Sequence, residues 1–142
     1  MSKPVFWDTA AFLALLNTRD RLHQPAIAIS QRLAAECRRM LTTSAVLIEV
    51  ANSLSKVNSR ALAWQLMSSI QHSVDLGTAE WIHVDQGLWQ RSWKLYCQRP
   101  DKEWSLTDCF SFIVMQDYGI LEAFTSDHHF EQAGFSRLLF PV

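Results

Sequence analysis

The chain has 142 residues, of which 49% are hydrophobic and 19% are charged, with a formal net charge of −1. This length buries a hydrophobic core without disulfides, and the composition excludes an intrinsically disordered chain. The near-neutral charge excludes the overall basicity of strong, non-specific nucleic-acid binders, although a local basic patch stays possible. We expect one domain over residues 1–142.

Short apolar strands alternate with helical patterns along the first half of the chain. The expected elements are a strand over 5–7, a helix over 10–16, a helix over 22–37, a strand over 40–43 and a helix that begins at Ser44. The first strand ends at Asp8. On the third helix, Glu49 lies beside a buried stripe of apolar side chains. That stripe consists of Val46, Leu47, Val50, Leu54 and Val57.

The same alternation continues through the second half. The expected elements are a helix around 62–70, a turn over 75–78, a strand over 81–84, a helix through 88–96, a helix from Ser105 to Gly119, a strand over 121–125, a short turn over 127–132 and a last strand over 137–140 that Pro141 ends. Ser105 and Asp108 fit the serine-x-x-acid pattern of a helix N-terminus. The order of elements predicts an α/β fold with a doubly wound, mostly parallel sheet flanked by helices.

Four acids, Asp8, Glu49, Asp108 and Asp127, each lie where a predicted strand gives way to a helix or just inside that helix. Because the carboxyl ends of parallel strands open onto one crevice, we expect these acids to share a metal pocket. Each aspartate also has an ordinary explanation as a helix cap or turn residue. Glu49 lies too far inside its helix to cap it. Asp85 ends another strand, and we assign it a capping role alone.

Two segments in the last third of the chain, 105–112 (SLTDCFSF) and 124–135 (FTSDHHFEQAGF), resemble the PIN-domain family, especially the VapC toxin ribonucleases. Segment 5–11 (VFWDTAA) resembles the family's first strand and acid, and segment 43–50 (TSAVLIEV) resembles its helix with the glutamate. The resemblance covers nearly the whole chain in the right order. Ser126 and His128 beside the fourth acid depart modestly from the family pattern.

The resemblance implies a metal-dependent endoribonuclease of PIN-like fold, acting as the toxin of a toxin–antitoxin pair. It matches Asp8, Glu49, Asp108 and Asp127 to the family's four acids and Thr125 to a supporting hydroxyl. We expect Asp8 and Asp108 as principal ligands of Mg²⁺ or Mn²⁺, since hard oxygen donors suit these ions. Glu49 and Asp127 are expected to bind directly or through water, with Thr9 or Thr125 orienting them. The number of ions, one or two, stays open.

The implied partners are an RNA substrate, a small antitoxin protein and a second copy of the chain. We recognise no leader, cleavage site or long apolar segment, so a cytoplasmic protein without membrane association is expected. The three cysteines, Cys37, Cys97 and Cys109, are expected to be buried thiols and not bridges or metal ligands.

Three alternatives are open or less favoured. An autonomous PIN nuclease in RNA processing would lack the antitoxin, and a receiver-like signalling module would also place acids at strand ends. A zinc site at His128 and His129 is less favoured, because no other cysteine or histidine pair has suitable spacing. Among the tryptophans, Trp7, Trp81 and Trp93 are expected in the core. Trp64 and Trp104 are candidates for a partner or dimer surface.

Overall fold

The computed structural model describes residues 3–140. Over this range the chain forms seven α-helices and five β-strands. In chain order they are β1 (Val5–Trp7), α1 (Thr9–Leu16), α2 (His23–Ala35), β2 (Met40–Thr43), α3 (Ser44–Ser53), α4 (Arg60–Asp75), β3 (Ala79–Ile82), α5 (Gln86–Gln98), α6 (Leu106–Tyr118), β4 (Glu122–Phe124), α7 (His129–Gln132) and β5 (Ser136–Arg137).

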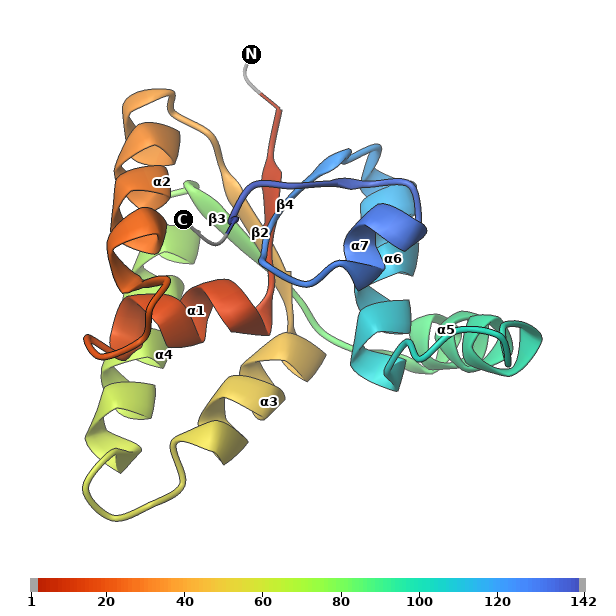
Figure 1. Ribbon diagram of the computed structural model, residues 1–142, viewed down its shortest axis with the longest axis horizontal. Helices are drawn as coiled ribbons and strands as arrows, with labels where there is room; N and C mark the ends of the chain where they lie inside the picture. The colour runs from red at the N-terminus through yellow and green to blue at the C-terminus, as the bar shows by residue number, and fades with distance from the viewer. Residues whose placement is uncertain (1–2, 141–142) are drawn as a thin grey trace.

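The five strands form one sheet of order β3-β2-β1-β4-β5, in which every neighbouring pair is parallel. Helices α1, α2 and α4 lie on one side of the strands, and α5, α6 and α7 lie on the other (Figure 1). The predicted doubly wound, parallel sheet is therefore confirmed. The strand order reverses between β1 and β4, which is where ligand crevices open at the carboxyl ends of such sheets.

Alternating side chains of β1 fill the core on both faces of the sheet. Phe6 is fully buried, and its ring centroid lies 6.3 Å from that of Phe130 on α7. Trp7 points to the opposite face, where its ring packs against Phe12 at 5.4 Å and Phe124 at 4.7 Å. This period-two alternation anchors β1 from both sides and holds the residue after it, Asp8, at a fixed position.

Several predicted environments are wrong. Val57 is 94% exposed because α3 ends at Ser53, before the next turn of the apolar stripe. Trp93 was expected in the core but is 47% exposed. Trp104 was expected on a partner surface but is only 7% exposed, and its ring packs edge-on against Phe112 with centroids 5.0 Å apart.

Other predictions of burial are confirmed. Trp64 is 71% exposed, as expected for a surface tryptophan. Trp7 and Trp81 are partly buried against the core. Cys109 is buried as expected, but Cys37 and Cys97 are exposed, so the expectation of buried thiols is wrong for two of the three cysteines.

The strand boundaries differ from the predicted ones. β3 covers Ala79–Ile82, two residues earlier than predicted, and β5 is reduced to Ser136–Arg137. Phe140, placed in the last predicted strand, is 53% exposed. Pro141, expected to end that strand, lies outside the described residues. Among the helices of residues 3–140, none has the length and apolar character needed to cross a membrane.

Candidate functional site

Asp8 directly follows β1 and occupies the N-cap position of α1, yet its side chain makes no capping hydrogen bond. Its carboxylate is directed elsewhere. Asp8 is only 5% exposed, and its Oδ2 accepts a 2.8 Å hydrogen bond from the hydroxyl of Thr125, which follows β4. The capping explanation for Asp8 is therefore not the one that the structure uses. The acid is part of a contact between the ends of β1 and β4.

The environment of Asp8 opposes its ionisation. Burial, together with the nearby charges of Asp108 and Asp127, raises the pKa of the carboxyl from 3.8 to about 7. The Thr125 hydroxyl, which stabilises the anion, offsets only part of this rise in the pKa. A carboxylate in this position is stabilised by a cation placed among the three acids.

Asp108 serves both as a helix cap and as part of the pocket. It is the third residue of α6, where the Ser105 hydroxyl accepts from the Asp108 N–H at 2.9 Å and Asp108 Oδ2 accepts from the Ser105 N–H at 3.1 Å. The same oxygen lies 3.1 Å from Nδ1 of His129. Burial, followed by the charge of Asp127, raises the pKa of Asp108. The capping box thus fixes this acid in the orientation that the pocket requires.

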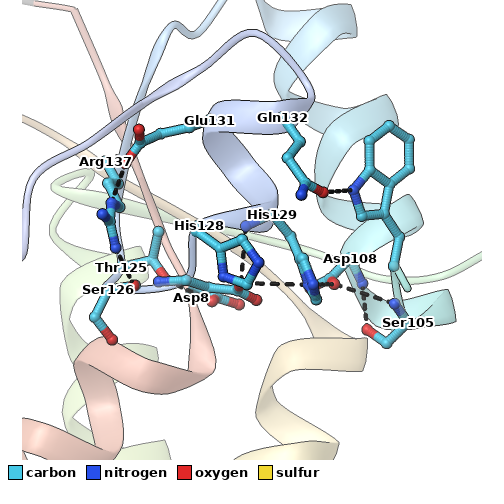
Figure 2. A network of polar contacts seen from close by, with 12 residues as sticks. Asp8, Ser105, Asp108, Thr125, Ser126, His128, His129, Glu131, Gln132 and Arg137 are labelled. Carbon is cyan, nitrogen blue, oxygen red and sulfur yellow. Dashed lines mark hydrogen bonds and ion pairs between the residues drawn. The ribbon is translucent and has the colours of Figure 1, made fainter. Parts of the chain in front are cut away.

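Asp127 lies in the turn between β4 and α7. Its backbone N–H donates to the Thr125 hydroxyl oxygen at 3.1 Å, and its Oδ1 accepts from the backbone N–H of His129 at 2.9 Å. Oδ1 is also 3.3 Å from the His129 ring nitrogen Nδ1. Figure 2 shows Asp8, Asp108 and His129 gathered at the foot of α7. Asp108 and Asp127 therefore both contact His129, and Asp8 is connected to the Asp127 turn through Thr125.

Glu49 joins the site through a neighbour. It is half-buried on α3, and its Oε1 accepts a 2.7 Å hydrogen bond from the hydroxyl of Thr9, the residue after Asp8. Within residues 3–140, no hydrogen bond or ion pair connects Glu49 directly to the three aspartates. The structure therefore brings Asp8, Asp108 and Asp127 together and places Glu49 beside Thr9 next to them.

Arg137 on β5 braces the turn that carries Asp127. Its Nη1 donates a 2.6 Å hydrogen bond to the carbonyl oxygen of Ser126, and its Nε pairs with the Glu131 carboxylate (Figure 2). Because Ser126 directly precedes Asp127, this contact restrains the backbone at the site.

His129 is the residue of the site that sequence reasoning missed, since it was considered for zinc alone. Its position two residues after Asp127 was the available signal, but the contact with Asp108 depends on how α7 packs against α6. Asp85, in contrast, behaves as predicted. Its side chain accepts a 2.8 Å hydrogen bond from the Leu88 N–H and caps α5.

Comparison with protein families gives one match, in which residues 5–136 align with the PIN domain. The chain belongs to the PIN domain family. The family assignment predicted from the sequence is confirmed, and the sheet order agrees with it. A receiver-like module would have the order 2-1-3-4-5, so the order of this PIN domain removes that alternative.

Two curated relatives of this PIN domain are the 23S rRNA-specific endonuclease VapC20 from two strains of Mycobacterium tuberculosis, CDC 1551 / Oshkosh and H37Rv. Each is 29% identical over 133 residues, covering 92% of this chain and 95% of the relative. The predicted similarity to VapC-type toxins is thereby confirmed.

Solved structures support the same fold. The crystal structure of Mycobacterium tuberculosis VapC20, described as a Sarcin-Ricin loop cleaving toxin, matches with a TM-score of 0.75 and 28% identity, covering 92% of this chain and 95% of that one. FitAB bound to an IR36 DNA fragment matches with a TM-score of 0.67 and 14% identity, covering 94% and 92% of the two chains. At that identity, the FitAB likeness shows the fold alone.

Proposed function

We propose that this PIN domain is a divalent-metal-dependent endoribonuclease that hydrolyses RNA phosphodiester bonds. The observation that carries the proposal is the buried Asp8, whose pKa is raised to about 7 beside Asp108 and Asp127. Carboxylates whose charges raise one another's pKa need a compensating cation to ionise together. Their oxygen donors fit Mg²⁺ or Mn²⁺, the hard cations that support phosphodiester hydrolysis.

Asp8 and Asp108 are proposed as the principal metal ligands, with Glu49 and Asp127 binding directly or through water. Thr125 orients Asp8, and Thr9 orients Glu49, through the hydrogen bonds described above. When bound, the cation supplies an activated water and neutralises charge that develops on the phosphoryl oxygens.

The remaining contributions come from the chain itself. The capping box of α6 holds Asp108 before any substrate arrives, and the Thr125 hydroxyl holds Asp8, so the acids need little rearrangement on binding. Such preorganisation lowers the cost of assembling the reactive geometry. The acids lie near the reversal of strand order between β1 and β4, which is where open α/β sheets bind their ligands.

We further propose that the protein is the toxin of a type II toxin–antitoxin pair that acts in the cytoplasm as a homodimer. The VapC20 relatives, named as rRNA-specific endonucleases, support this assignment. An unrestrained endoribonuclease would cleave the RNA of the cell that makes it. A small antitoxin that covers the acidic pocket is therefore the expected partner.

The test is RNA cleavage by purified wild type, Asp108→Asn and Asp85→Asn. The RNA panel includes the sarcin–ricin loop of 23S rRNA and unrelated RNAs, with Mg²⁺, Mn²⁺ or a chelator. Asp108→Asn should lower kcat/KM by roughly a hundredfold or more, because a metal ligand contributes several kcal/mol to the transition state. The amide oxygen still accepts from the Ser105 N–H, so folding should be retained.

Asp85→Asn is the matched control, since Asp85 also follows a strand and caps a helix but lies outside the pocket. Its cleavage rate should equal that of wild type. Cleavage by Asp108→Asn at the wild-type rate, or undiminished cleavage with the chelator, would contradict the proposal. Expression without growth arrest would favour the alternative of an autonomous PIN nuclease over that of a toxin.

A further inference from the structure

The turn that carries Asp127 also places two imidazoles beside it. Asp127, His128 and His129 each offer one ligand atom, and these atoms all lie within 4.8 Å of one another. Asp127 Oδ1 is 3.3 Å from Nδ1 of His129 and 3.8 Å from Nδ1 of His128. One carboxylate oxygen and two ring nitrogens therefore converge at the rim of the acidic pocket.

These donors differ in kind from those of the neighbouring aspartates. Oxygen-only sets suit Mg²⁺, whereas imidazole nitrogen favours Zn²⁺, Co²⁺ and similar transition metals. Two histidines, a carboxylate and a water make a common four-coordinate zinc environment. We propose that Asp127, His128 and His129 form a binding site for a borderline divalent transition-metal ion, which shares Asp127 with the oxygen site but does not use Asp8.

The contacts of His129 prepare it for this role. Its ring nitrogen Nδ1 lies 3.1 Å from Asp108 Oδ2, and its side chain is only 18% exposed. The same nitrogen lies 3.3 Å from Asp127 Oδ1, so the two carboxylates together hold the imidazole with Nδ1 turned toward the proposed ligands. The second aspartate of the pocket thus orients a ligand of the new site.

His128 is the solvent-exposed ligand of the proposed site. Its side chain is 67% exposed, and its ring centroid is 4.5 Å from that of His129. An exposed side chain can change rotamer at little cost, so His128 can close onto an ion that His129 and Asp127 already hold. The site therefore combines one fixed and one adjustable imidazole, and it stands on these side chains whether or not the chain cleaves RNA.

The test is metal binding by the metal-stripped, full-length protein. Zn²⁺ and Mg²⁺ are titrated by calorimetry, and Co²⁺ is followed by its visible absorption, which reports nitrogen ligation. His128→Asn should weaken Zn²⁺ and Co²⁺ binding roughly tenfold or more, as loss of a ligand costs at least as much as loss of its supporting partner. Its Mg²⁺ affinity should be unchanged. His72→Asn, an exposed histidine on α4, is the matched control and should bind all three ions like wild type.

Equal Zn²⁺ affinity in wild type and His128→Asn would overturn the site, and so would an equal loss in His72→Asn. Asp8→Asn separates the two metal sites, since it should weaken Mg²⁺ binding and leave the Co²⁺ spectrum unchanged. Loss of the Co²⁺ spectrum in Asp8→Asn would show that there is one shared site and overturn the proposal. None of these readouts uses RNA cleavage, so a failure of the proposed nuclease function would be seen separately.

Discussion

The Thr125 hydroxyl donates a 2.8 Å hydrogen bond to Asp8 Oδ2, across 117 positions of the sequence. The hydroxyl oxygen also accepts from the backbone N–H of Asp127 at 3.1 Å. One side chain therefore positions the acid after β1 and the turn after β4. Because both contacts are made by a fully buried residue, Thr125 links the two strands at the point where the sheet reverses its order.

Thr125→Val tests this link. Valine keeps the shape of threonine but leaves a buried carboxylate without its donor and the Asp127 N–H without its acceptor. Each such loss costs about 1–3 kcal/mol, so the free energy of unfolding should fall by at least this amount. The pKa of Asp8 should rise further, since the hydrogen bond that lowers it is gone. Urea unfolding and NMR titration of the Asp8 carboxyl measure the two effects. Thr18→Val, at an exposed position, should change neither.

The raised pKa of Asp8 predicts that the metal-free protein loses stability as the pH rises. Between the ordinary value of 3.8 and the folded value of about 7, the folded state binds more protons than the unfolded state. The stabilisation is fully present below this window and is lost as the pH passes through it, by an amount on the order of a few kcal/mol. The pKa of Asp108 is also raised, which adds to the same trend. Urea unfolding with a chelator at a series of pH values measures it.

Two comparisons identify the cause of this pH dependence. Asp8→Asn removes the titrating group and should flatten the curve, with the variant more stable than wild type above neutral pH. Saturating Mg²⁺ should raise the stability of wild type most at high pH, because the cation binds the ionised acids of the folded state. Stability of the metal-free wild type that increases from pH 4 to pH 7 would contradict the assignment.

The hydrogen bond between Thr9 and Glu49 predicts a graded series of variants. Thr9→Val removes a side chain that orients a proposed ligand, and such losses lower metal affinity by about 10–100-fold. Thr9→Ser keeps the hydroxyl and should restore most of the affinity. Glu49→Gln weakens the ligand itself and should lower Mg²⁺ affinity at least as much as Thr9→Val. Calorimetric titration with Mg²⁺ measures the order, and a Thr9→Ser variant as weak as Thr9→Val would refute it.

Arg137→Gln should loosen the turn that carries Asp127. The variant loses the 2.6 Å hydrogen bond to the Ser126 carbonyl and the ion pair with Glu131. We expect faster amide hydrogen exchange at His129, whose N–H donates to Asp127, with exchange in the β1 core unchanged. Arg21→Gln, at an exposed position on the other side of the sheet, is the control. Equal protection of the His129 amide in wild type and Arg137→Gln would show that Arg137 does not restrain the turn.

The positions of the strands and of the acids at their ends were predictable from local pattern. Asp8 follows a short apolar run, Val5 to Trp7, and Asp108 stands three residues after a serine that caps its helix. Both signals are carried by neighbours in sequence. The first places Asp8 at the carboxyl edge as soon as the strands are parallel, whereas Asp108 begins a helix that follows another helix, α5. The approach of Asp108 to Asp8 therefore depends on how α6 packs against the sheet and was not predictable from the strand pattern alone.

The environments of Trp93, Trp104 and His129 were not predictable in this way. Trp93 fits the apolar pattern of α5, but that helix presents only one side to α6 and leaves Trp93 half exposed. Trp104 precedes α6 in an irregular segment, and its indole N–H donates to Gln132, which is 28 positions away. His129 meets Asp108 only because α7 packs against α6. Each of these contacts joins elements whose mutual placement is decided by the whole core.

The reversal of strand order between β1 and β4 also determines when a newly made chain can bring its acids together. Asp8 is translated 117 positions before Thr125, and β4 must enter the sheet beside β1 before the two side chains meet. A nascent chain that has been translated only as far as α6 has three of the four acids and lacks the Thr125 hydroxyl that holds Asp8. The contact that holds Asp8 can therefore form only after β4 has been made and has joined β1.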